Sequence, residues 1–146
     1  MTQNPAPHQP RGFGASRDTL APTETDLLVL SRELGRPVRD VVEIPARCVC
    51  GNPLVAATAP RLSNGSPFPT VFYLAHPVIT QASSRLEAAG LMYEMTDRIA
   101  QDDEVADAYQ AAHRNYLAER ERVRLASGTD PVPEICLLYT SDAADE

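Results

Sequence analysis

The chain has 146 residues, of which 43% are hydrophobic, and a net charge of −7 at pH 7. This length is sufficient for one domain with its own core, and the negative charge argues against a general nucleic-acid-binding protein, which normally presents a basic surface. No apolar run is long enough to span a membrane, and no signal-peptide core is present, so we expect a cytoplasmic protein.

The N-terminal stretch differs in composition from the rest. Residues 1–22 are rich in proline, glycine and polar residues and show no apolar period. Such a segment cannot bury enough apolar surface to fold, which predicts a disordered tail. A single domain is expected to follow at residues 23–135.

The first predicted helix lies in "TETDLLVLSRELGRP". Thr23 is placed to cap its start, and Asp26 three residues later completes a pair typical of a capping box. Gly35 and Pro37 predict its end. An apolar stripe at helical spacing predicts the buried side: Leu27, Leu30 and Leu34.

Two strands are predicted next, in "VRDVVEIPARCV" and "PLVAATA". The first is rich in β-branched residues, the second includes Val55 and Thr58, and the turn-rich "CGNP" between them favours a hairpin. Because side chains alternate along a strand, Cys48 and Cys50 are expected on one face of the first strand, at its end.

A loop, "PRLSNGSPFPT", follows the hairpin. Asn64 and Gly65 predict a tight turn, and three prolines restrict the backbone. The next run, "VFYL", predicts a short buried strand or extended segment. The rigidity that the prolines give to the preceding loop is typical of a functional loop.

Three helical segments complete the predicted fold. One begins near Pro77 and is interrupted by Gly90, after which "LMYEMTDRIAQ" continues. Its predicted buried side is formed by Val78, Ala82, Leu86 and Ala89.

The longest helix is expected in "DDEVADAYQAAHRNYLAERERVRLA", with acidic residues at its start and arginines at its end, both favourable to the helix dipole. Its predicted stripe is Val105, Tyr109, Ala112 and Tyr116. The predicted class is therefore α+β: a small β-hairpin or sheet packed against several helices, with one long C-terminal helix.

The last eleven residues, 136–146, read "CLLYTSDAADE". Their reverse translation matches, in one frame, the read-through of a transposase-type sequencing adaptor. We therefore expect a translated adaptor rather than native sequence, and a domain incomplete at its C-terminus with an apolar patch left uncovered. The alternative is a native, mildly amphipathic tail.

Four runs of the sequence resemble a known family: "LSRELGRPVRDVVEIPARC", "APRLSNGSPFPTVFYLAHP", "SRLEAAGLMYEMTDRI" and "AYQAAHRNYLAER". Together they resemble the domain-of-unknown-function family five-zero-one, found mainly in high-GC Gram-positive bacteria, over roughly positions 25 to 126. The family carries no established activity. The resemblance implies a further stretch, similar to "GMP.RVKCLH" and a later histidine, which this sequence lacks.

Cys48 and Cys50 are the metal-binding candidates, because thiolates are ligands that zinc and iron prefer. The resemblance implies that the other ligands lie in the missing stretch, so zinc is expected only in the full-length protein. The alternative is that Cys48 is a small, buried strand residue and Cys50 an incidental neighbour.

Four polar side chains are candidates for an anion-binding site: Arg61, Asn64, His76 and Arg85. We expect Arg61, His76 and Arg85 to surround one pocket, with the proline-rich loop at its rim and Glu87 orienting an arginine. The alternatives are a solvated loop, a capping histidine and a surface ion pair of little energetic value. His113, inside the long helix, is a further candidate for a ligand or a general base, and the alternative is a half-buried histidine.

The sequence assigns no catalytic residue. The leading interpretation is a non-enzymatic binding or regulatory domain, metal-stabilised in the full-length chain, whose partner is a protein or a phosphate-bearing ligand. The alternative is a metal- or phosphate-dependent enzyme whose remaining site residues lie in the lost C-terminal segment.

Overall fold

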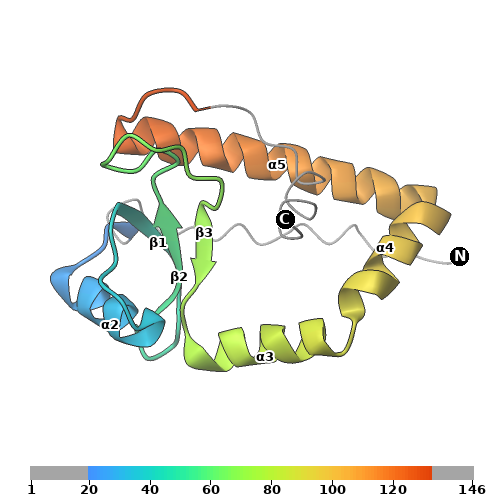
Figure 1. The fold of residues 1–146 in the computed structure, drawn as a ribbon, viewed down its shortest axis with the longest axis horizontal. Helices are drawn as coiled ribbons and strands as arrows, with labels where there is room; N and C mark the ends of the chain where they lie inside the picture. The colour runs from blue at the N-terminus through green and yellow to red at the C-terminus, as the bar shows by residue number, and fades with distance from the viewer. Residues whose placement is uncertain (1–19, 133–146) are drawn as a thin grey trace, which may run out of the picture.

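A three-stranded antiparallel sheet with helices against both faces forms the centre of the computed structural model, which describes residues 20–132 (Figure 1). The strand order is β1-β2-β3. The elements are α2 (Glu24–Leu34), β1 (Val41–Arg47), β2 (Pro53–Thr58), β3 (Phe72–Leu74), α3 (Pro77–Ala88), α4 (Leu91–Gln101) and α5 (Asp103–Ser127). The α+β class is therefore confirmed, and the predicted "VFYL" strand is β3. The predictions for residues 1–19 and 136–146 lie outside the described part of the chain.

The predicted capping box of α2 is present. The Thr23 hydroxyl accepts from the amide of Asp26 at 3.1 Å, and the Asp26 carboxylate accepts from the amide of Thr23 at 2.9 Å. Gly35 ends the helix in the left-handed region, at φ 69°, where a side chain would be strained. Local hydrogen bonding within a few residues thus defines both ends of α2.

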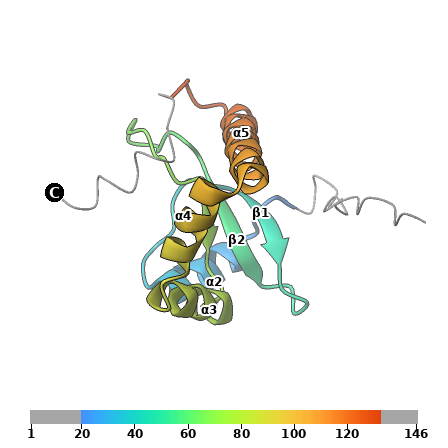
Figure 2. The same ribbon diagram turned by 90° about the vertical axis from the view of Figure 1, so that its right-hand side faces the viewer.

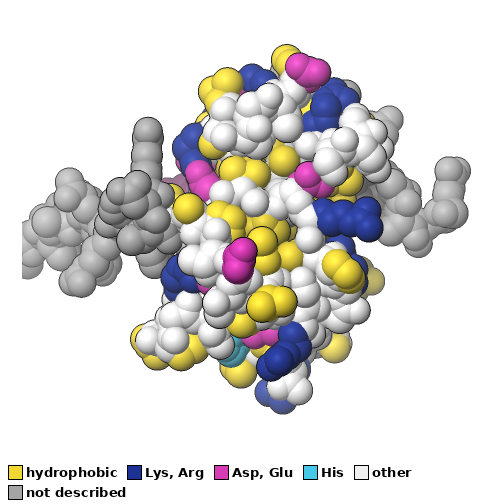
Figure 3. All heavy atoms as spheres, turned by 90° about the vertical axis from the view of Figure 1, so that its left-hand side faces the viewer, with side chains coloured by type: hydrophobic (Ala, Val, Ile, Leu, Met, Phe, Trp, Pro, Cys, Tyr) yellow, Lys and Arg dark blue, Asp and Glu magenta, His cyan; other side chains and the backbone are white. Residues whose placement is uncertain are grey.

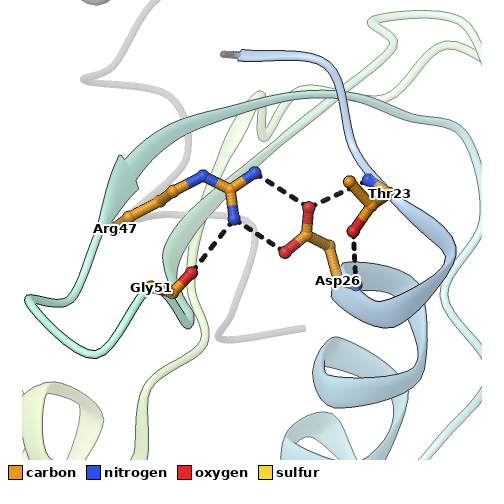
Figure 4. Close-up of polar contacts among 4 residues, drawn as sticks. All are labelled: Thr23, Asp26, Arg47 and Gly51. Atoms are coloured by element: carbon orange, nitrogen blue, oxygen red, sulfur yellow. Dashed lines mark hydrogen bonds and ion pairs between the residues drawn. The ribbon is translucent and has the colours of Figure 1, made fainter.

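Asp26 also connects α2 to the sheet (Figure 4). Both terminal nitrogens of Arg47, the last residue of β1, donate to its carboxylate, at 2.7 and 2.8 Å. One of these nitrogens also donates to the carbonyl of Gly51 at 3.1 Å. One guanidinium therefore joins the start of α2, the end of β1 and the β1–β2 turn.

A β-bulge in β1 determines which side chains face which helix. Val41 pairs with Thr58 and Glu43 with Ala57, so two steps along β1 match one step along β2. As a result Val42 packs against the cluster that contains Val123 of α5, and the neighbouring Glu43 also binds α5, through Arg122 at 2.9 Å.

The core has two halves, one on each face of the sheet. Leu30 of α2 packs with Ile44, Ala56 and Ala75, and Val123 of α5 packs with Ala57 and Val71. Adjacent residues of β2 therefore point into opposite halves, as the two-residue period of a strand requires. Figure 2 shows the sheet between α2 and α5.

The proline-rich loop between β2 and β3 is held by α5. The hydroxyl of Tyr116 accepts from the amide of Val71 at 3.2 Å and donates to the carbonyl of Pro69 at 3.0 Å. Arg120, only 6% exposed, donates to the carbonyl of Phe68 at 3.5 Å. Arg120 was predicted only to complement the helix dipole; instead it contacts this loop, and burial lowers its pKa.

Helices α3 and α4 and the first half of α5 project away from the sheet as an arm, residues 77–115 (Figure 1). No residue of α3 or α4 is buried, and the buried residues of α5 lie in its second half. The predicted buried side of α3 was therefore wrong: it is exposed at Val78, Ala82, Leu86 and Ala89. The helical period is real, but these four side chains stay exposed because α3 projects away from the sheet.

Within residues 20–132, no helix combines the length and apolar character that crossing a bilayer requires.

Candidate functional site

A cavity of about 460 Å³ opens on the α2 side of the sheet, near the end where β1 begins. Its walls come from residues 34–41, from Ala56 and Thr58 of β2, and from the loop that includes residues 62–64. Figure 3 views the molecule from the side where α2 lies, and hydrophobic side chains gather there between arginines and carboxylates. The volume is in the range of small-molecule sites.

The cavity combines an apolar floor with polar groups at its walls. Phe68 and Tyr73, which stack with ring centroids 5.9 Å apart, both contribute to the lining. Arg36 and Arg39 line the wall that residues 34–41 form. Neither arginine forms an ion pair with any residue in the described range, so both charges are available to a ligand.

Asp40 lies on the same wall as these two arginines, in an unusual backbone conformation. Its φ is 56°, and among the described residues no other non-glycine residue has a positive φ. Its carbonyl accepts from the amide of Ala59 at 2.9 Å, and its carboxylate accepts from the hydroxyl of Ser63 at 3.3 Å. These bonds connect the end of the α2–β1 segment to the loop and hold the cavity in shape.

Of the four predicted anion-binding residues, Asn64 lines this cavity. Its side-chain oxygen accepts from the amide of Ser66, which stabilises the tight turn predicted at Asn64 and Gly65. Arg61 instead stabilises the loop. Its guanidinium donates to the carbonyl of Gly65 at 2.6 Å and to that of Pro131 at 2.7 Å.

His76 and Arg85 lie at the other end of the sheet from Arg61. Arg61 follows the end of β2, whereas His76 follows the end of the antiparallel β3 and caps α3, accepting from the amide of Val78 at 3.3 Å. Arg85 is exposed in the last turn of α3. The structure therefore does not bring Arg61, His76 and Arg85 around one pocket, and it gives His76 the capping role that was the alternative.

His113 is half-buried in α5, and its Nδ1 has no hydrogen-bond partner among the described residues. It does not line the cavity beside the sheet.

Cys48 and Cys50 lie in the β1–β2 turn rather than in a strand. Strand β1 ends at Arg47, and the amide of Gly51 donates to the carbonyl of Cys48 at 2.8 Å, closing a turn over residues 48–51. Cys48 is half-buried and Cys50 is exposed. A hydrogen bond from the Cys50 thiol lowers the pKa of Cys48. The expectation that both cysteines share a strand face was therefore wrong, because the strand ends one residue earlier.

The described residues contain no group of three or more His, Cys, Asp or Glu side chains placed to hold a metal ion. The two cysteines by themselves fall short of the four ligands of a structural zinc site. Zinc in the full-length protein stays a prediction.

The residues missed by the sequence analysis are Arg36, Arg39 and Asp40. They stand in "GRPVRD", which was read only as a helix end followed by a strand. Gly35 and Pro37 mark an irregular connection, and such connections often carry binding residues. The pattern of Gly35 and Pro37 could have drawn attention to residues 35–40, but it gives no indication of the loop that faces them.

The fold and cavity define an α+β domain with a pocket of small-molecule size between a helix–strand connection and a proline-rich loop. A family model described as "Protein of unknown function (DUF501)" matches residues 44–136, more than half of the chain, and the chain belongs to this family. No curated protein and no solved structure matches the sequence. The match begins within β1, so the loop wall of the cavity lies inside it and residues 34–41 precede it.

Proposed function

We propose that this chain is a binding domain whose ligand is a small phosphate-bearing molecule with an apolar group, held in the cavity between residues 34–41 and the proline-rich loop. The observation that carries the proposal is the pair of arginines on one wall of that cavity. Arg36 and Arg39 make no ion pair with the described residues, and a phosphate would satisfy both.

The other groups of the cavity match the remainder of such a ligand. Leu34 and Phe68 offer apolar contact, and Thr58 offers a hydroxyl. The Asp40 carboxylate, already bonded to Ser63, would disfavour a ligand whose negative charge extends across the cavity. This arrangement supports a single anionic group near the arginines and an apolar group over the sheet.

The experiment is a titration with phenyl phosphate, followed by amide chemical shifts in NMR. We expect shifts at residues 36–40 and at Thr58. Inorganic phosphate, which lacks the apolar group, and benzyl alcohol, which lacks the charge, should each bind at least about tenfold more weakly, since one part of the contact is lost.

Arg36→Gln and Arg39→Gln should each reduce phenyl phosphate affinity about tenfold or more. Arg85→Gln is the matched control, because Arg85 is an exposed arginine on α3 that does not line the cavity. Equal losses in all three variants would mean that the anion is attracted by the general surface, and the proposed site would be wrong.

An enzyme acting on the same class of ligand is the second candidate. The observation in its favour is the Asp40 carboxylate that accepts from the Ser63 hydroxyl inside the cavity, a pairing in which a carboxylate can serve as a base. Release of phosphate from phenyl phosphate, lost in Ser63→Ala while binding persists, would favour the enzyme over the binding domain.

A further inference from the structure

The β1–β2 turn presents two cysteines in a short, exposed stretch of backbone. Cys48 is the first residue and Cys50 the third of the turn closed by the bond from the Gly51 amide to the Cys48 carbonyl. Val49, between them, is fully exposed. A second bond, from the Cys48 amide to the carbonyl of Asn52 at 2.8 Å, holds the base of the turn.

This backbone holds the two cysteine residues close to each other. A β-turn keeps its first and fourth Cα atoms within about 7 Å, so its first and third residues lie within the span that a disulfide bridges. The Cys50 thiol and the backbone of Val49 and Cys50 together lower the pKa of Cys48.

The rest of the domain holds the turn in place. Arg47 donates to the carbonyl of Gly51, and the same guanidinium is bonded to the buried carboxylate of Asp26. Gly51 itself has a φ of 88°, which favours glycine at this position. The folded chain thus restricts residues 48–51 to a conformation that the unfolded chain visits only rarely.

We propose that Cys48 and Cys50 form a reactive dithiol that exchanges with small-molecule disulfides and closes into a Cys48–Cys50 disulfide. One cysteine thiolate attacks a sulfur of the small disulfide, forming a mixed disulfide and releasing one small thiolate. The second cysteine, as its thiolate, attacks the protein sulfur of that mixed disulfide and releases the other small thiolate. The two cysteines are oxidised, one small disulfide is reduced to two thiols, and the cysteine protons pass to the released thiolates.

The test uses the chain with Cys136→Ser, which removes the third cysteine of the sequence. The reduced protein is equilibrated with reduced and oxidised glutathione at neutral pH, quenched with acid and measured by mass spectrometry. We expect loss of both thiols with no added glutathione. Cys48→Ser and Cys50→Ser, each with Cys136→Ser, should instead accumulate the mixed disulfide.

A second measurement distinguishes the effect of the folded turn on disulfide formation from the effect of having two cysteines one residue apart. The same equilibrium is measured in concentrated urea. We expect the ratio of closed disulfide to dithiol to be at least about tenfold larger in the folded chain, equivalent to about 30 mV in reduction potential.

Two results would overturn the proposal. One is that the folded chain carries two separate glutathione adducts or disulfide-linked dimers in place of the closed ring. The other is an equal or smaller closed fraction in the folded chain than in urea, which would show that the turn opposes the disulfide or makes no contribution to it.

Discussion

The contact between Asp26 and Arg47 shows how much one side chain contributes to this fold. Asp26 is only 5% exposed, accepts from the Thr23 amide and binds Arg47 through both carboxylate oxygens. The hydrogen bonds from Arg47 are the main reason that the pKa of Asp26 falls from 3.8 to about 2. The sequence predicted its pairing with Thr23 but not with Arg47, which is 21 residues away.

The lowered pKa of Asp26 predicts a specific loss of stability in acid. Because the folded-state pKa is below the unfolded value, the contribution is fully present above about pH 4 and is lost as the pH falls towards about 2. The shift corresponds to about 2 kcal/mol in the free energy of unfolding. Urea unfolding measured between pH 7 and pH 2 should show this decrease.

Asp26→Asn should remove that part of the pH dependence and lower stability at pH 7 by about 2 kcal/mol. Glu24→Gln is the control, because Glu24 lies in the same first turn but is exposed. A pH profile that Asp26→Asn leaves unchanged would contradict the assignment of the effect to Asp26.

At the scale of elements, the second half of α5 positions the wall of the candidate site. Tyr116 binds the backbone of Pro69 and Val71, and its ring meets Phe72 edge-on with centroids 6.2 Å apart. The sequence placed Tyr116 on the apolar stripe of the helix, and the structure shows it half-buried there. Its hydroxyl has the further effect of holding the proline-rich loop, which no helical period could indicate.

Tyr116→Phe should destabilise the domain by about 1–3 kcal/mol, because Val71 is fully buried and its amide would lose its partner. Packing against Phe72 should persist. Hydrogen exchange of the Val71 amide, together with urea unfolding, tests this. Tyr109→Phe, on the exposed half of the same helix, should change stability by less than about 0.5 kcal/mol.

At the scale of the whole molecule, the arm of residues 77–115 contrasts with the packed half. Its exposed apolar side chains include Met92 at 64% and Tyr93 at 81%. Apolar side chains of α4 and α5 also line a second cavity of about 240 Å³ near the tip, including Met95 and Tyr109. These exposed groups form an apolar surface on α4 and the first half of α5.

The arm should contribute little side-chain packing to stability. Met92→Ser and Tyr93→Ser should each change the free energy of unfolding by less than about 0.5 kcal/mol. Val123→Ala, in the packed half of α5, should cost about 2 kcal/mol, because Val123 is fully buried between α5 and the sheet. Amides of α3 and α4 should also exchange faster than those of β2.

Comparable costs for Met92→Ser and Val123→Ala would contradict this contrast and show that the arm is packed in solution.

The sequence by itself determined the local features of this protein. Capping at Thr23, the glycine end of α2, the turn at Asn64 and Gly65 and the succession of helices and strands all follow from interactions among residues close in the chain. These depend on backbone propensity and short-range hydrogen bonds, which a single sequence displays directly.

Only the tertiary structure decided which helical faces are buried and where the cavity lies. Val78 and Leu86 have the spacing of a buried face yet remain exposed, while Arg120, a charged residue, is buried. The cavity exists because Asp40 meets a loop more than twenty residues later. Such contacts depend on how elements distant in sequence pack, and periodicity within one element carries no information about the element that faces it.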